Sequence, residues 1–375
     1  MLAIPETERP GYLEARADPV FGHVVTRITG DVGSPIAGVG GQWAEVARHG
    51  YSKRAAWNAD MSLLHLDRHQ GEPGALFLDG RTYAPLFASR LSCTEARWHP
   101  LDPERMIYVR GNELGSWRVR EDATEILATF EGCDDLHIGP WEGNLSLDGR
   151  RIALYGRRGE RAVAFAYDLA GRVQYPDIPL DGIEVDWVSV SASGDYLVIN
   201  GTIDGGGDRT RVFDLEGRPV GPTWEEYGRP SHYDLTLDED GEDIAVGVSQ
   251  SHPNMGRVIK RRLRDGKATA LTPGGFASHT STRNTAQPGW AYVTYQTRSE
   301  NWPPFYDEVV AVKLDGSMTL RRLAHLRTRI TDYESEAHAV PSPDGSRVLW
   351  ACNWEAAEGR PIAAYVVAVP APPAP

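Results

Sequence analysis

The sequence predicts an all-β protein, a seven-bladed β-propeller closed by a strand from the N-terminus. The 375 residues include 39 Gly, 26 Pro, 11 Trp and 15 Tyr, a composition that favours many short strands joined by turns. Turn-like dipeptides recur about every 45 residues, and strand-like runs follow several of them. A period of ~40 to 50 residues with about four strands per repeat is typical of a propeller blade.

The repeats can be followed along the chain from their turns. The turns are Asp60-Met61, Asp102-Pro103, Asp148-Gly149, Ser193-Gly194, Asp240-Gly241, Pro288-Gly289 and Asp344-Gly345. Strand-like runs after them include RRIALYG from Arg150, DYLVING from Asp195, DIAVGVS from Asp243, WAYVTYQ from Trp290 and RVLWACNW from Arg347. Three repeats show a further strand before a glycine, in AFAYDLAG, RVFDLEG and EVVAVKLDG. We therefore expect seven blades between residues ~40 and 370.

The ends of the chain complete this arrangement. The segment HVVTRITG at residues 23–30 precedes the first repeat and alternates like a strand, so we expect it to pair with the last blade and close the ring. The expected organisation is one propeller domain over residues 1–370, followed by a Pro-rich tail over residues 371–375. A pair of β-sandwiches and a β-solenoid are the competing interpretations of the same strands.

Composition narrows the function classes. With 39 Lys+Arg against 52 Asp+Glu the net charge is -13, which argues against broad binding to nucleic acid or an anionic membrane. Three cysteines without a C-x-x-C motif predict neither a disulfide framework nor structural zinc. The first residues do not resemble a signal peptide, so the expected location is the cytoplasm, or the periplasm or exterior if a leader was removed.

The innermost strand of each blade points side chains at the central channel, and chemistry-bearing residues occupy these places. They are His49 and Tyr51, Arg97 and Trp98, Trp141 and Glu142, Asp186 and Trp187, His232 and Tyr233, His279, and Glu336 and His338, from the first blade to the seventh. Radial symmetry would bring His232, His279 and His338 toward one axis, where they and Glu336 could bind a metal ion. Each histidine alone is equally consistent with a hydrogen-bonded channel residue.

Five segments resemble the seven-bladed polysaccharide lyases. They are HGYSKRAAWNAD from His49, WEGNLSLDG from Trp141, SHYDLTLDEDG from Ser231, SHTSTRNTAQPGWAYV from Ser278 and EAHAVPSPDG from Glu336. The resemblance extends over most of the chain and is closer to the ulvan lyases, which cleave rhamnose-linked glucuronate, than to the oligogalacturonate lyases. It implies the same propeller fold and a lyase activity.

The ulvan lyase resemblance implies one set of site residues. His49 and His69 look like the histidine pair of that family, and Arg157 looks like the arginine that neutralises the substrate carboxylate. The family's tyrosine falls on Trp141 here, so Tyr51 and Tyr233 are the nearest replacements for an acid or base.

The oligogalacturonate lyase resemblance implies a second set. His232 corresponds to the catalytic base, while His279 and His338 correspond to metal ligands. Glu336 takes the place of the first histidine of the family's H-x-H pair. A mixed nitrogen and oxygen site of this kind binds Zn, Mn or Ca, and no organic cofactor is expected.

The chemistry explains why such residues would gather. A uronate lyase removes the proton at C5 and expels the oxygen at C4, so the carboxylate must be neutralised by an arginine such as Arg157 or Arg158, or by a metal. Histidine and tyrosine are suited to the two proton transfers. The remaining candidates for substrate binding are Tyr51, Lys53, Trp141 and Trp187, and basic residues in the first and third blades would favour an acidic sugar.

We therefore hypothesise a lyase that cleaves a rhamnose-linked glucuronate chain by β-elimination, with His49, His69, Arg157 and Tyr233 as catalytic residues. The alternative hypothesis is a non-catalytic propeller that binds carbohydrate or protein and holds a structural metal. A glycoside hydrolase would need two carboxylates flanking a sugar, and Glu142 with Asp186 form the one channel pair available for it.

Overall fold

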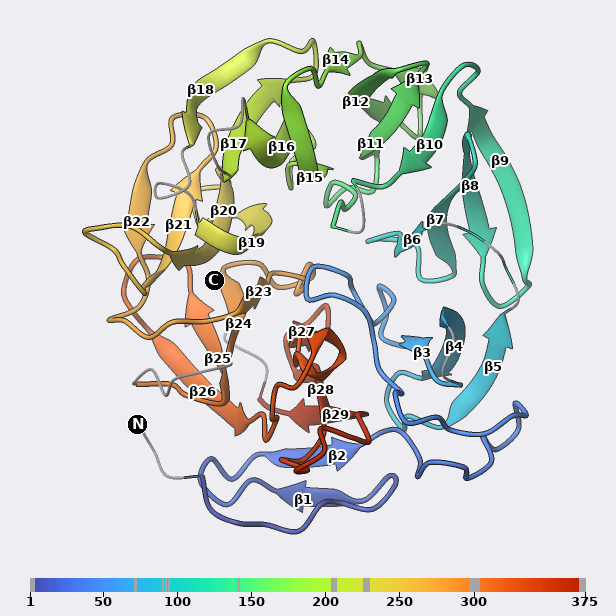
Figure 1. Cartoon of the computed structure of the whole chain (residues 1–375), viewed down its shortest axis with the longest axis vertical. Coiled ribbons are helices and arrows are strands. Elements are labelled where there is room, and N and C mark those ends of the chain that lie inside the picture. The colour runs from blue at the N-terminus through green and yellow to red at the C-terminus, as the bar shows by residue number, and fades with distance from the viewer. Residues whose placement is uncertain are drawn as a thin grey trace.

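The protein is a ring of seven β-sheets (Figure 1). The computed structural model describes residues 4–70, 73–89, 91, 93, 95–139, 142–203, 208–224, 230–296 and 304–370. Within these ranges the single helical element is the short 3-10 turn η2 (Tyr333–Ser335). The described part of the chain contains no helix that is long and apolar enough to span a membrane.

Each sheet is one blade, and the blades follow one another along the chain. Blade 1 contains β3 (Leu63–Arg68), β4 (Pro73–Asp79) and β5 (Pro85–Ser89). Blade 2 contains β6 (Glu95–Trp98), β7 (Arg105–Arg110), β8 (Glu113–Arg118) and β9 (Ala123–Thr129). Blade 3 contains β10 (Asp134–His137), β11 (Arg151–Arg158), β12 (Arg161–Asp168), β13 (Val173–Gln174) and β14 (Ile178–Pro179). Blade 4 contains β15 (Ile183–Val190), β16 (Tyr196–Ile203), β17 (Asp208–Asp214) and β18 (Pro219–Trp224).

The second half of the ring continues the pattern. Blade 5 contains β19 (Pro230–Leu237), β20 (Asp243–Ser249), β21 (Val258–Arg262) and β22 (Ala268–Ala270). Blade 6 contains β23 (His279–Ser281), β24 (Trp290–Tyr295), β25 (Glu308–Lys313) and β26 (Leu320–His325). Blade 7 contains β27 (Val340–Pro341), β28 (Arg347–Cys352) and β29 (Ala363–Ala368), joined by β1 (Ala15–Ala17) and β2 (Val24–Arg27) from the N-terminus.

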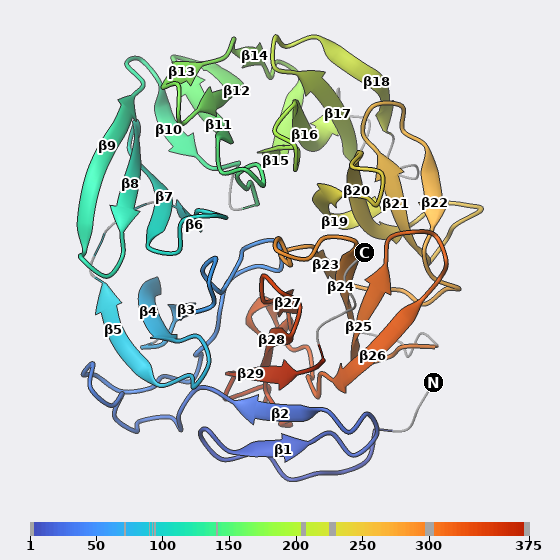
Figure 2. The same cartoon turned by 180° about the vertical axis from the view of Figure 1, so that it is seen from behind.

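The ring is closed by strands from both ends of the chain. β2 pairs antiparallel with β29, with Val25 opposite Val367, and β1 adds a further strand outside β2. Figures 1 and 2 both show these two strands along the outer edge of β29. The predicted seven-bladed propeller and its N-terminal closing strand are confirmed. The additional strand β1 was not predicted, because three residues are too few to show a sequence period.

The blades are held together by apolar contacts between neighbouring sheets. In the described part of the chain the buried apolar residues form seven clusters, one at each junction between adjacent blades. Alternation along a strand explains this, because successive side chains point to opposite faces of a sheet. In β24, Trp290 and Tyr292 pack toward blade 7, whereas Ala291 and Val293 pack toward blade 5. The channel is therefore left to residues at the inner ends of the blades.

The predicted turns form, and their glycines have a conformational reason. Gly149, Gly194, Gly241, Gly289 and Gly345 all have positive φ, between 67° and 93°, a region in which glycine is the least strained residue. Because each of these turns ends one inner strand, their spacing fixes the length of the blade repeat.

The inner strands are less regular than the sequence pattern predicts. The pairings of β10, β15 and β19 with their neighbours each contain a register shift. Among its described residues, blade 1 has no continuous strand on the inner side of β3, and two isolated bridges, Arg48–Arg68 and Trp57–Leu64, take its place. These irregularities matter because they decide which side chains face the channel.

Candidate metal and active site

Three possible metal ligands from blades 6 and 7 lie close together, at or just before the innermost strands of these blades. His279 is the first residue of β23, and Glu336 and His338 lie between η2 and β27. Nε2 of His279 lies 3.7 Å from Oε2 of Glu336, and Nε2 of His338 lies 3.8 Å from the same oxygen. One ligand atom from each residue lies within 4.8 Å of the other two. The structure thus brings together three of the four residues predicted as metal ligands.

The surroundings of this cluster fit a divalent metal ion. Ligand atoms ~2.1 Å from such an ion lie roughly 3 to 3.5 Å apart, close to the separations seen here. His338 is 1% exposed, and neither of its ring nitrogens has a hydrogen-bond partner among the described residues. Buried polar groups are normally satisfied, so two unpartnered imidazole nitrogens beside a carboxylate fit a metal ligand set. Burial holds the pKa of both His279 and His338 well below the usual value, which favours the neutral form that binds metal.

His232 stands beside this cluster rather than within it. Its ring stacks on the ring of His279, with 4.9 Å between centroids and 18° between planes. Nδ1 of His232 lies 2.6 Å from the carbonyl oxygen of Ser278. Because a carbonyl only accepts, Nδ1 carries the hydrogen, and the neutral ring presents its lone pair on Nε2. The side chain is exposed, so this lone pair suits a base that meets substrate.

The local backbone explains the position of His232. Its φ is 41°, in the left-handed region, and it falls within the register shift of the β19–β20 pair. Bulges next to active sites re-aim a side chain, and backbone strain of this kind collects at functional sites.

Glu336 is positioned by the 3-10 turn before it. Asp332 caps η2 by accepting a hydrogen bond from the amide of Ser335, and its carboxylate is also bound by Arg360 at 2.6 Å. The amide of Glu336 donates to the carbonyl of Tyr333 at 3.1 Å. The turn therefore presents the Glu336 carboxylate from a fixed backbone.

Two tyrosine rings contact the histidines. Tyr51 lies 4.7 Å from the ring of His338 and 5.2 Å from that of His279, measured between centroids. Burial raises its pKa well above the usual value, so its hydroxyl keeps its proton at neutral pH. Tyr333 lies 5.4 Å from His338 and is 57% exposed. Sequence reasoning missed Tyr333, although its place three residues before Glu336 was a usable signal.

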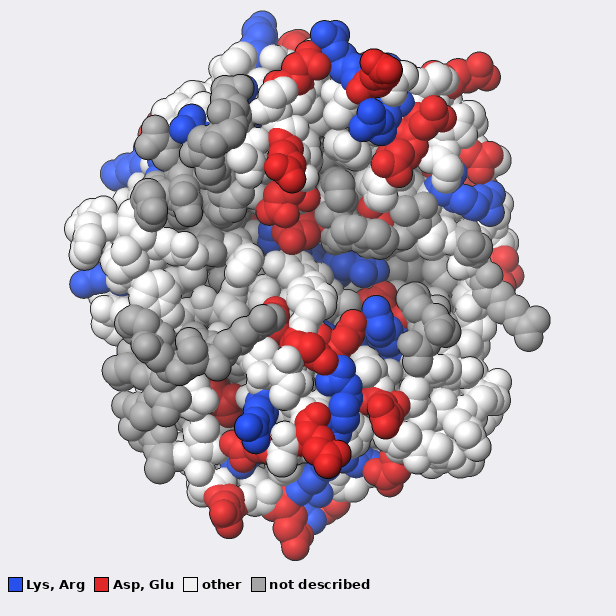
Figure 3. Space-filling view, viewed as in Figure 1, with Lys and Arg blue, Asp and Glu red and all other residues white. Residues whose placement is uncertain are grey.

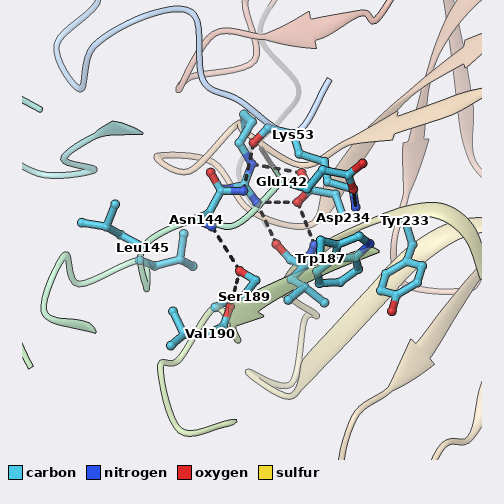
Figure 4. A pocket seen from close by; sticks show the side chains of 13 residues that line it. Lys53, Glu142, Asn144, Leu145, Trp187, Ser189, Val190, Tyr233 and Asp234 are labelled. Carbon is cyan, nitrogen blue, oxygen red and sulfur yellow. Dashed lines mark hydrogen bonds and ion pairs between the residues drawn. The ribbon is translucent and has the colours of Figure 1, made fainter. Parts of the chain in front are cut away.

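Lys53 lies in a closely packed group that lines a small cavity (Figure 4). It is 2% exposed, its Nζ lies 2.5 Å from Oε2 of Glu142, and the ammonium sits 4.0 Å above the ring of Trp187. An ion pair and a cation–π contact together compensate a buried lysine. The cavity around them has about 10 Å³ of free space, room for roughly one water. This cavity is therefore too small for a sugar, which has to bind outside it.

The ring of Tyr233 lines the cavity around Lys53, whose Nζ lies 5.3 Å from the ring centroid, but the Tyr233 hydroxyl, the group predicted to be catalytic, is bonded elsewhere. Tyr233 is 1% exposed, and its hydroxyl lies 2.6 Å from Oγ1 of Thr210, on a middle strand of blade 4. Figure 4 shows this hydroxyl pointing away from Lys53 and Glu142. His232 and Tyr233 both lie in the register shift of the β19–β20 pair, which sets the direction of their side chains.

The catalytic set of His49, His69 and Arg157 stays a prediction, and the structure shows where each of the three residues lies. No hydrogen bond, ion pair or ring contact joins any two of these three described residues. Nε2 of His49 lies 2.7 Å from the carbonyl oxygen of His338, and burial lowers the pKa of His49 to about 3. Arg157 is exposed, and its guanidinium donates to the carbonyl of Glu160. His69 is buried after β3, its Nδ1 without a partner.

Three of the basic residues predicted to attract an acidic sugar form ion pairs with carboxylates. Arg54 binds Asp67 at 3.0 Å, and Arg158 binds Asp177. Arg68 lies 3.2 Å from Glu334. Figure 3 shows acidic and basic side chains mixed around a hollow near the centre of the ring. Trp141, another predicted substrate-binding residue, lies outside the described residues.

Comparisons with known proteins agree with the fold. No protein-family model matches the chain, and no curated protein matches it in sequence. Among solved structures, the oligogalacturonate lyase of Vibrio parahaemolyticus is similar with 12% identity and a TM-score of 0.64, covering 95% of this chain and 96% of that one. An oligogalacturonate lyase in complex with manganese has 15% identity, a TM-score of 0.67 and the same coverage.

A propeller of a different kind is also similar. The β-propeller domain of Swd1 from Myceliophteria thermophila has 14% identity and a TM-score of 0.50, covering 87% of this chain and 99% of that one. Identities this low show a common propeller architecture, and function has to be argued from the site itself.

Proposed function

We propose that this protein is a lyase that cleaves uronate-containing oligosaccharides by β-elimination. The observation that carries the proposal is the meeting of His279, Glu336 and His338, with the exposed imidazole of His232 stacked beside them. Such an elimination needs a counter-charge for the carboxylate and a base for the adjacent C5 proton at the same sugar. His279, Glu336 and His338 offer a site for a metal ion as the counter-charge, and His232 is the candidate base.

The residues of the chain divide the work as follows. His279, Glu336 and His338 would hold a divalent ion, which would supply positive charge at the substrate carboxylate. Nε2 of His232 accepts the C5 proton, because its Nδ1 hydrogen is held by the carbonyl of Ser278.

Departure of the C4 oxygen needs a proton donor on the other side of the sugar. Tyr51 fits this role, since burial keeps its hydroxyl protonated and its ring contacts both metal-site histidines. Lys53 is ion-paired with Glu142, so its charge is already compensated and its contribution is to fix the packing of the cavity wall. We assign Lys53 and Tyr51 to the floor of the substrate site.

The sugar is a uronate, and two identities are to be compared. The similarity to oligogalacturonate lyases, one of them in complex with manganese, supports galacturonate and Mn²⁺. The sequence resemblance to ulvan lyases supports glucuronate linked to rhamnose. The carboxylate, C5 proton and C4 leaving group are common to both, so the same residues serve either substrate.

The test is an activity assay of the whole protein loaded with Mn²⁺, Zn²⁺ or Ca²⁺. Oligogalacturonate, ulvan, rhamnose-capped arabinogalactan and glucuronan are offered, and ultraviolet absorbance of the unsaturated 4,5-uronate is followed. We expect product from at least one substrate, and its loss on chelation or in His338→Ala. A folded protein that binds a metal but yields no unsaturated product with any of them contradicts the proposal and supports a binding propeller with a structural ion.

A further inference from the structure

We propose that His49 is a positioning residue for the metal ligand His338, and that it acts through the backbone rather than on substrate; this rests on the metal site of the proposed function. His49 comes from the segment before blade 1, whereas His338 belongs to blade 7. The two residues meet across the junction where the ring closes. Nε2 of His49 donates to the carbonyl oxygen of His338 at 2.7 Å, and both side chains are at most 2% exposed.

The backbone of His338 needs external support. Its φ is 47°, in the left-handed region, which is strained for a residue with a Cβ. Such a conformation persists where the surroundings fix it. Since the direction of the imidazole follows from the backbone, the groups that fix φ also decide where the ring nitrogens point.

Side chains of blade 6 hold the amides on either side. The amide of Ala337 donates to Oε1 of Gln296 at 2.9 Å, and the amide of Ala339 donates to Oγ1 of Thr294 at 3.0 Å. The carbonyl of His338 is bound from the opposite side, by His49. The ligand segment is thus fixed by side chains of both neighbouring blades, and His49 supplies the contact from blade 1.

Arg48 strengthens the same contact. Its Nη1 donates to the carbonyl of Glu334 in η2, and its Nε donates to the carbonyl of His49 at 3.1 Å. Residues 48 and 49 therefore bind two backbone carbonyls of the segment that carries Glu336 and His338. Partners that orient metal ligands commonly change metal affinity by 10- to 100-fold when removed.

The experiment measures the Kd of Mn²⁺ by calorimetry for the whole protein and for three variants. His49→Met removes the N–H donor but fills a similar space, whereas His49→Gln keeps a donor that can reach the carbonyl. His69→Met is the matched control, because His69 is also a buried histidine of blade 1 but its Nδ1 has no hydrogen-bond partner among the described residues. Circular dichroism checks that each variant is folded.

We expect His49→Met to weaken Mn²⁺ binding by at least about tenfold, His49→Gln to stay within about threefold of the wild type, and His69→Met to leave Kd within about twofold. Wild-type affinity in His49→Met, or equal weakening in His69→Met, overturns the inference. If His49→Met does not fold, His49→Asn, whose amide is too short to span the gap, takes its place.

The result is separable from that of the lyase assay. Metal binding that depends on His49 in a protein without lyase activity supports this inference and refutes the proposed reaction. Lyase activity in a protein whose metal affinity is unaffected by His49→Met supports the proposed reaction and refutes the inference about His49.

Discussion

Replacement of His232 by asparagine is the most direct test of the proposed base. Asparagine suits this position because it tolerates the left-handed region better than other residues with a Cβ, and the φ here is 41°. Its side-chain amide can still donate to the carbonyl of Ser278, but it has no basic nitrogen. The variant therefore removes proton transfer while it disturbs the backbone least.

The expected magnitude follows from what His232 contacts. Loss of a positioned base lowers kcat by about 10²- to 10⁴-fold, which corresponds to roughly 2.7 to 5.5 kcal/mol of transition-state stabilisation. Loss of the ring stacking on His279 costs stability by about 0.5 to 1.5 kcal/mol, so we expect Tm to fall by roughly 1 to 4 °C. His279, Glu336 and His338 are unchanged, so the Kd of Mn²⁺ should remain within about twofold.

The assay combines steady-state formation of the unsaturated product with calorimetric titration of Mn²⁺. The matched control is His23→Asn, since Nδ1 of His23 also contacts a backbone carbonyl, that of Leu323, but His23 precedes the closing strand β2. We expect full activity in the control. His232→Asn with at least a tenth of wild-type kcat would refute the assignment of His232 as base, and a large loss of metal affinity would place His232 among the ligands.

Three further predictions concern the metal, the sugar and the pH dependence of stability. Glu336→Gln keeps the shape of the ligand but removes its charge, so calorimetry should show at least about tenfold weaker Mn²⁺ binding; unchanged affinity would exclude Glu336 from the site. Tyr333→Ala should raise KM by about 5- to 30-fold with kcat nearly unchanged, because an exposed ring beside His338 can pack on a sugar, and Tyr333→Phe should behave as wild type. Burial raises the pKa of Asp307 from 3.8 to about 8, so its contribution to folding is fully present below pH 3.8 and is lost as the pH rises through about 8. Asp307→Asn should therefore raise Tm at pH 9 but not at pH 4, and the same change at both values would contradict this origin.

The fold could be predicted because each blade repeat is determined by short segments of the sequence. An Asp-Gly or Ser-Gly turn and the strand that follows it need only neighbouring residues, as at Gly149 and Gly241 with φ of 69° and 77°. The ligand set could be predicted in part for the same reason. His279 and His338 occupy comparable places in consecutive blades. Because the blades surround one axis, residues at comparable places come close together in the structure.

The roles of other residues could not be predicted, because they depend on contacts between distant segments. Lys53 and Glu142 are 89 residues apart, and their ion pair turns an expected substrate-binding lysine into part of a closed channel floor. His49 looks like a catalytic histidine in sequence, but its donor nitrogen is directed at a backbone carbonyl 289 residues away. Side-chain direction within blade 5 depends on a register shift that no residue pattern announced.

The two histidines with positive φ suggest how a regular scaffold acquires a site. His232 lies in the register shift of β19, and His338 precedes β27. Each makes a hydrogen bond with a neighbouring blade, the His232 ring with the carbonyl of Ser278 and the His338 carbonyl with the ring of His49. In the middle of a regular strand such as β24, successive side chains enter the two interblade cores. The converging imidazoles come instead from the first residue of β23 and from these two residues with irregular backbone. The packing of neighbouring blades and the assembly of the site therefore depend on the same contacts.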